Sequence, residues 1–234
     1  MQMDNLHSAS QRGDLAAIKR LVERGKDINS KEGSYCTPLH HAAENGHLKI
    51  VKFLVEKGAD KDAKNNYGDQ TPVHAAALRG HFEIVKFLVE CGADKEAEDE
   101  FAWTPLHDAA EIGHLEMVKF LVESGANKEV KDAFMSTPLH LAASIGNLEI
   151  VKHLVESGAN IELKNWRNLT PLQFAQNQRQ TSIVNYLSLK QKNSMQKGLQ
   201  QVQQHANVVS TELSRGFQQQ GIGGISFFSF FSTN

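Results

Sequence analysis

Thr-Pro recurs at a fixed interval of 33 or 34 residues along this chain of 234 residues. The pairs begin at Thr37, Thr71, Thr104, Thr137 and Thr170, and all five prolines of the chain belong to them. Glycine keeps the same interval in two series, at Gly25, Gly58, Gly92, Gly125 and Gly158, and at Gly13, Gly46, Gly80, Gly113 and Gly146. A period held by several residue types indicates a chain built from stacked copies of one structural unit.

Each unit predicts two short helices. Thr followed by Pro is typical of a helix start, because threonine caps the free N–H groups and proline has no N–H to leave unpaired. A first helix over 38–45 would end before Gly46, since glycine tolerates the left-handed conformation after a helix. A second helix over 47–57 carries Leu48, Val51 and Leu54 at helical spacing and would end before Gly58. One unit is therefore a pair of antiparallel helices with a polar connector.

The stretch TPLHHAAENGHLKIVKFLVEKGAD is similar to the ankyrin repeat, which has a 33-residue period and a T-P-L-H-x-A signature. The resemblance covers residues 4 to about 189 in six copies. It implies an all-α repeat solenoid of helix-turn-helix units joined by β-hairpin-like loops, spanning 1–189. Residues 1–33 and 166–189 are expected to be capping repeats, because they depart from the signature where an end repeat meets water. Arg179, for example, stands where the other copies carry glycine.

The hairpins also depart from the family pattern D-x-x-G-x-T-P. The glycine position holds Tyr35, Asp69, Ala102, Met135 and Asn168, so the sequence does not by itself support the usual tight turn. One extra residue lies between Gly58 and Thr71, which predicts a bulged or longer hairpin there.

Charge and hydropathy limit the function classes. Residues 190–234 hold four Lys/Arg and one Asp/Glu, which leaves 21 against 26, a net charge of −5, for residues 1–189. An acidic body of this kind argues against a nucleic-acid partner. No apolar run is long enough for a membrane span, and the N-terminus has no signal-peptide pattern, so a cytoplasmic protein is expected. Cys36 and Cys91 have no metal-ligand spacing and are expected to be plain thiols.

No catalytic chemistry is indicated, and we expect neither an enzyme nor a metal or cofactor site. The chain has no P-loop, GxSxG, HExxH or paired-cysteine motif. Most histidines repeat with the unit and are interpreted as structural; they are His40, His74, His107 and His140 after Thr-Pro-Leu/Val, and His47, His81 and His114 after glycine. The connector residues Asp62, Glu96, Glu98, Asp99 and Glu129 are interpreted as a solvated face. Asn29, at the same repeat position as Asp62, matches a site that in the family can accept asparagine hydroxylation.

The surface carries the functional hypothesis. Ankyrin proteins contact partners through their hairpin tips and the first helices of the concave face, and here those positions are rich in large apolar groups. The resemblance assigns partner contacts to Tyr35, Tyr67, Phe101, Trp103, Phe134, Met135, Trp166 and Leu169 at the tips, and to Leu78, Arg79, Glu111, Ile112 and Ile145 on the first helices. Such a stripe is typical of a protein-binding site, although the rings could instead pack against neighbouring hairpins.

The segment after the repeats differs in composition. Residues 190–217 predict a Gln-rich amphipathic helix, because Met195, Leu199, Val202, Ala206, Val209 and Leu213 alternate steps of four and three. Weak self-association, docking on the last repeat, or a second contact through 195–231 are its alternative roles. Residues 218–234 are expected to form a flexible Gly/Phe-rich tail, with Phe227, Phe228, Phe230 and Phe231 as a linear motif or an export signal.

Together these observations predict a non-catalytic scaffold or adaptor that binds another protein. A stoichiometric inhibitor or an assembly chaperone would use the same surface. The alternative is a bacterial-type effector that the C-terminal tail directs into a host cell, since ankyrin arrays also occur in translocated effectors.

Overall fold

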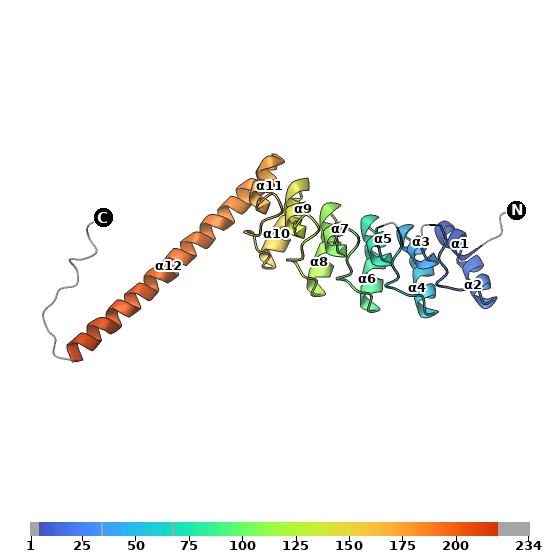
Figure 1. Cartoon of the computed structure of the whole chain (residues 1–234), viewed down its shortest axis with the longest axis horizontal. Coiled ribbons are helices and arrows are strands. Elements are labelled where there is room, and N and C mark those ends of the chain that lie inside the picture. The colour runs from blue at the N-terminus through green and yellow to red at the C-terminus, as the bar shows by residue number, and fades with distance from the viewer. Residues whose placement is uncertain (1–4, 34, 67, 220–234) are drawn as a thin grey trace. The chain divides into compact units, whose positions relative to one another are not determined.

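The computed structural model describes residues 5–33, 35–66 and 68–219. Helices follow one another in pairs along the chain (Figure 1). The first helices of the pairs are α1 (Leu6–Arg12), α3 (Pro38–Glu44), α5 (Pro72–Leu78), α7 (Pro105–Glu111), α9 (Pro138–Ile145) and α11 (Pro171–Asn177). The second helices are α2 (Leu15–Glu23), α4 (Leu48–Glu56), α6 (Phe82–Glu90), α8 (Leu115–Glu123), α10 (Leu148–Glu156) and α12 (Thr181–Gln219). The fold is thus the all-helical array of paired helices that the repeat predicts.

Helix starts and stops follow the predicted residues. Thr37 is the N-cap of α3, with Pro38 at its first position and a capping box between Thr37 and His40. The chain turns after Asn45 into Gly46, whose φ of 77° is left-handed. These local features set the length of every first helix to about two turns, so that the chain can turn back within each repeat.

The core is one layer continuous from repeat to repeat. It contains Ala42, Ala43 and Leu39 from α3 and Ile50 and Leu54 from α4, and the equivalent residues of the other pairs. Neighbouring first helices pack against each other, and each second helix from α2 to α10 packs against its own first helix. Consecutive second helices from α2 to α10 also pack against each other. Small alanines on the first helices allow that close approach. The array is therefore held together by contacts between adjacent repeats.

The compact array ends at Leu187, whereas helix α12 continues to Gln219. Ile183 and Leu187, in the first turns of α12, are buried in the repeat core. The repeats are expected to end at 189 and a Gln-rich helix to span 190–217; in the structure one helix, Thr181–Gln219, runs across that boundary. The physical reason is that no Gly or Pro occurs between Thr181 and Gly198, so nothing stops the helix after the last repeat.

Candidate functional site

The hairpin between α6 and α7 keeps a tight turn without glycine. Asp99 and Trp103 pair through the Asp99 N–H and the Trp103 carbonyl (2.9 Å), and Asp99 Oδ1 accepts the N–H groups of Phe101 (2.8 Å) and Trp103 (2.9 Å). Ala102 takes a left-handed φ of 57° between them. A left-handed alanine costs roughly 1–2 kcal/mol, and the two bonds to the carboxylate offset that cost. The missing glycine therefore does not remove the turn.

Two further hairpins repeat this arrangement. Asp132 Oδ1 accepts the N–H groups of Phe134 (2.8 Å) and Ser136 (2.7 Å), and Asn165 Oδ1 accepts those of Arg167 (3.0 Å) and Leu169 (3.2 Å). All five residues at the glycine position are left-handed, with φ between 56° and 61°: Tyr35, Asp69, Ala102, Met135 and Asn168. In these three hairpins an Asp or Asn stands three residues earlier. This residue is the sequence signal that explains why a residue other than glycine is tolerated in the left-handed conformation.

The hairpin between α4 and α5 is longer, as the extra residue predicts. Asn65 pairs with Gln70, five residues away, through the Asn65 N–H and the Gln70 carbonyl (3.0 Å). Gly68 (φ 79°) and Asp69 (φ 57°) are both left-handed and accommodate the insertion. Tyr67, a predicted contact residue, lies outside the described residues.

Backbone hydrogen bonds join consecutive tips. One N–H of each tip donates to a carbonyl of the tip before it: Glu100 to Gly68 (2.7 Å), Ala133 to Phe101 (2.8 Å) and Trp166 to Phe134 (3.0 Å). The donors and acceptors belong to the main chain, so the bonds do not depend on which side chains stand at the tips. Four hairpins are thereby fixed relative to one another.

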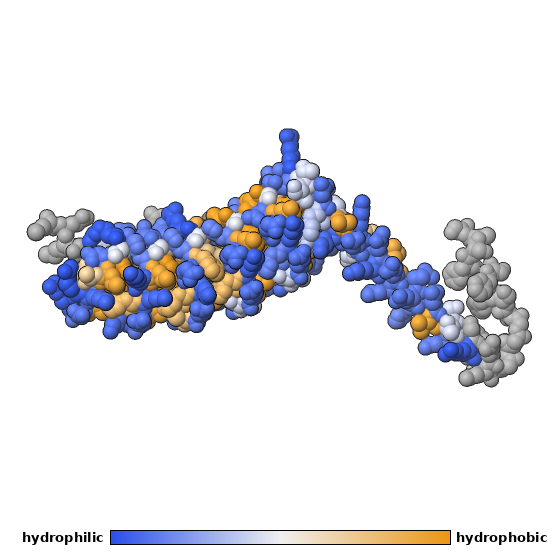
Figure 2. All heavy atoms as spheres, turned by 180° about the vertical axis from the view of Figure 1, so that it is seen from behind, coloured by the Kyte–Doolittle hydropathy of each residue, from blue (hydrophilic) through white to orange (hydrophobic). Residues whose placement is uncertain are grey.

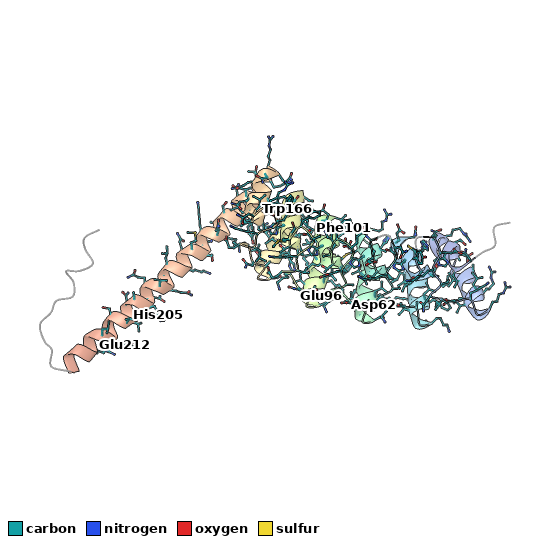
Figure 3. The ribbon with its side chains drawn as sticks, in the orientation of Figure 1. Asp62, Glu96, Phe101, Trp166, His205 and Glu212 are labelled. Atoms are coloured by element: carbon teal, nitrogen blue, oxygen red, sulfur yellow. The ribbon has the colours of Figure 1, made fainter. Side chains whose placement is uncertain are left out.

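Large apolar side chains on these tips are open to solvent. Relative exposure is 51% for Phe101, 52% for Phe134 and 58% for Trp166, and Tyr35 and Met135 are also exposed. Figure 3 places Phe101 and Trp166 along the same edge of the array. At the C-terminal ends of the first helices, the predicted residues Leu78, Arg79, Ile112 and Ile145 are exposed as well. Seen from behind, hydrophobic residues also form a band along the repeats between hydrophilic borders (Figure 2).

Three predicted contact residues are less exposed than the others. Trp103 is half-buried, and its ring stacks on His107 with centroids 6.2 Å apart. Leu169 and Glu111 are half-buried too, and burial raises the pKa of Glu111. Trp103 is thus only partly open to solvent, because its ring covers the start of its own helix.

Neighbouring tip residues also contact each other. The rings of Phe134 and Trp166 lie 6.5 Å apart, and the Arg167 guanidinium lies 4.8 Å from the centre of the Trp166 ring. Arg79 forms an ion pair with Glu44 (2.8 Å) across two first helices. The tips and the adjoining helix ends thus provide a surface of aromatic groups with a few charges between them.

The histidines after Thr-Pro-Leu/Val join each helix start to the next hairpin. His74 Nδ1 accepts the Thr71 N–H (3.2 Å), so its proton lies on Nε2, which donates to the Trp103 carbonyl (3.0 Å). Equivalent bonds link His40 to Gln70 and His140 to Leu169. Burial lowers the pKa of all four of these histidines, that of His40 to about 4. This geometry supports the structural interpretation of these residues.

The histidines after glycine also connect repeats. His47 Nε2 lies 3.0 Å from the Gln11 carbonyl and His81 Nε2 lies 3.0 Å from the Glu44 carbonyl. A Cβ on Gly46 would come 2.7 Å from the His81 ring. Glycine is needed there for its backbone conformation and also to leave room for the next repeat. Arg179, at the equivalent position of the last repeat, is also left-handed, at φ 58°.

The connector residues are more than a solvated face. Oxygen atoms of Asn29, Asp62, Glu96 and Glu129 each accept the backbone N–H at the start of the next connector, from Asp60 (2.9 Å), Asp94 (2.8 Å), Asn127 (3.0 Å) and Asn160 (2.9 Å). Figure 3 shows Asp62 and Glu96 on the edge of the array opposite Phe101 and Trp166. Their recurrence at one repeat position was the available signal for this role.

Sequence reasoning missed Asp108. This residue is 1% exposed, and its Oδ2 has no hydrogen-bond partner. Burial raises its pKa well above the usual value, and the charge of Asp99 adds to that effect. At this position three other repeats hold the apolar Ala75, Leu141 and Phe174 and one holds His41, so an aspartate at a mostly apolar position was the available signal.

Other functional groups are sparse in the residues that the structure describes. Within them, no three His, Cys, Asp or Glu residues are grouped to hold a metal ion, and no helix has the length and apolar character to cross a bilayer. Cys36 is buried and Cys91 is exposed, and neither forms a disulfide. The phenylalanine cluster Phe227–Phe231 lies outside the described residues.

Comparison with known families agrees with this geometry. A family model described as ankyrin repeats in three copies matches residues 6–99, 64–132 and 106–197. The chain therefore belongs to the ankyrin-repeat family, whose arrays are typically protein-binding modules and usually non-catalytic. No curated protein matches the sequence at a significant level.

Proposed function

We propose that the array binds another protein through its hairpin tips and the adjoining ends of its first helices. The observation that carries this proposal is the exposure of Phe101, Phe134 and Trp166 on hairpins whose backbones are bonded to one another. Burying such rings against a partner removes apolar surface from water, at roughly 25 cal/mol per Å². Aromatic residues are also the commonest anchors of protein interfaces.

The mechanism is rigid presentation. Binding costs free energy when loops must be ordered, and here the tip backbones are already ordered by bonds within and between hairpins. A few aromatic anchors can then supply most of the affinity. The exposed groups on the first helices, Leu78, Arg79, Ile112 and Ile145, extend the surface beyond the tips.

Within this class, a non-catalytic scaffold or adaptor in the cytoplasm is the role that we propose. An inhibitor or an assembly chaperone would use the same surface, and its partner would distinguish them. The effector alternative depends on the C-terminal residues, which are outside the described part of the chain, and so no structural observation favours it.

A photo-crosslinking experiment tests the proposal. The full chain would carry a benzophenone amino acid at Phe101 or Trp166 and, as a control, at the exposed Glu90 on α6. Crosslinking in cell extract should join one defined protein to the 101 and 166 variants and not to the 90 variant. Equal products from all three positions, or none at 101 and 166, would contradict the proposal.

A further inference from the structure

Helix α12 carries an apolar seam outside the array core. Met195, Leu199, Val202, Val209 and Leu213 are between 47% and 69% exposed, and Ala206 is exposed between them. Their alternate spacing of four and three residues places all six on one helix face. The rest of this segment is mainly hydrophilic, with isolated hydrophobic residues visible in Figure 2. A solvated helix does not need such a seam, and burying it would stabilise the segment.

We propose that a second copy of this chain covers the seam, in an antiparallel two-stranded coiled coil formed by residues 195–213 of both copies. This inference is independent of the function proposed above. It makes the protein a homodimer through a segment that the repeats do not use.

Side-chain sizes favour the antiparallel register. When Met195 of one copy faces Leu213 of the other, Leu199 faces Val209 and Val202 faces Ala206, so every layer is filled by two different residues. The small Ala206 is then opposite a larger valine. A parallel pair in register would place Ala206 against Ala206 and leave a gap in the middle of the seam.

Charge favours the same direction. The basic residues Lys190, Lys192 and Lys197 lie at the start of the segment, while Glu212 and Arg215 lie near its end. A parallel pair in register would bring Lys192, which lies three residues before Met195 on the same face, against Lys192 of the other copy. An antiparallel pair in the proposed register instead places the two Lys192 residues at opposite ends of the seam. Figure 3 labels both His205 and Glu212 on α12, and Glu212 lies nearer the C-terminal end of the helix.

The expected interface is small. Six residues from each copy would bury roughly 1,000 Å² in total, at the lower end of specific interfaces. The dimer should therefore have a Kd of roughly 1–100 μM, so that it forms at high protein concentration and dissociates on dilution.

Sedimentation equilibrium of the full chain, across a wide range of protein concentration, tests the proposal. The wild type should show a monomer–dimer equilibrium. Replacing Leu199 and Val209 together by Gln should leave it monomeric over the same range, because this removes two layers while keeping a good helix former. Val208→Gln is the matched control, since Val208 is exposed but lies off the seam, and it should still dimerise. A monomeric wild type, or a dimer that survives Leu199→Gln with Val209→Gln, would overturn the proposal.

The direction of the helices needs a second measurement. In a Cys91→Ser background, Met195→Cys and Leu213→Cys variants would be treated with a short bis-maleimide, separately and mixed. The antiparallel pair predicts cross-linked dimer mainly in the mixture. Efficient cross-linking of each variant with itself, and none in the mixture, would show a parallel pair and overturn the proposed register.

Discussion

The backbone N–H of Trp166 donates to the carbonyl of Phe134 at 3.0 Å, and the two rings lie 6.5 Å apart while both remain more than half exposed. The main chain therefore positions these residues, and their rings have no place in the buried core. Backbone hydrogen bonds hold the tips in place, while the exposed aromatic side chains are available to a partner. The proposed binding function depends on this division. It also allows folding and binding to be measured as independent consequences of mutation.

Trp103 is expected to behave differently from Phe101. Its ring is half-buried on His107, so Trp103→Ala should lower the free energy of unfolding by about 1–2 kcal/mol. Phe101→Ala should leave it within about 0.5 kcal/mol. Urea unfolding of both variants measures this difference. Equal stability of the two would mean that the contact between Trp103 and His107 contributes nothing to folding.

Asp108 is expected to destabilise the protein at neutral pH. Its raised pKa means that the folded state holds a proton more tightly than the unfolded state, so this residue's contribution worsens as pH rises above the usual carboxyl pKa. Asp108→Ala, which copies Ala75, should therefore stabilise the array by about 1–2 kcal/mol near pH 7. The advantage should shrink toward pH 4. Urea unfolding across this pH range measures it, and a loss of stability at pH 7 would show that the carboxylate has a favourable partner.

The buried histidines should produce the opposite pH dependence. Their folded pKa values are lowered, so the stability they contribute is complete above about pH 6.5 and is lost as pH falls through the folded values. Each histidine adds a slope of at most about 1.4 kcal/mol per pH unit. His74→Gln copies Gln173, which accepts the Thr170 N–H at 3.0 Å. The variant should show a shallower slope between pH 6.5 and 4.5, and an unchanged slope would rule out a titrating His74.

The two glycine series allow a matched test of inter-repeat packing. Gly46 and Gly58 are both left-handed, but only at Gly46 would a Cβ meet a neighbouring side chain, that of His81. Both alanine variants pay the backbone cost of about 1 kcal/mol. Gly46→Ala should cost at least 1 kcal/mol more by thermal or urea unfolding. Equal losses would show that His81 moves aside freely.

The sequence was sufficient for the repeat, the helix pairs, the caps and the longer hairpin before Thr71, because each depends on local residues such as Thr37, Pro38 and Gly46. It was not sufficient for interactions between repeats. The bond from Asp94 to Asp62 and the stacking of Trp103 on His107 require two segments whose distance in space the pattern does not give. Asp108 was missed although the apolar residues at the same position of other repeats, such as Ala75 and Leu141, were a signal that this position is buried.

The positions that make up the candidate surface were predictable from the sequence. Which of them are most exposed to solvent was not. Phe101 and Trp103 are two residues apart in one turn, and the capping by Asp99 directs one to solvent and the other toward the helix start. Helix α12 also runs through the boundary expected at 189, because no Gly or Pro stops it before Gly198.

The most direct measurement combines binding and stability on the same variants. Once crosslinking has identified a partner, its Kd and the free energy of unfolding would be measured for the wild type and for Phe101→Ala, Trp166→Ala and the buried control Leu106→Ala. We predict that the two tip variants weaken binding by about 1–3 kcal/mol with stability nearly unchanged. Leu106→Ala should instead lose about 2–5 kcal/mol of stability. Tip variants that bind as the wild type does, or that lose stability as Leu106→Ala does, would contradict the account.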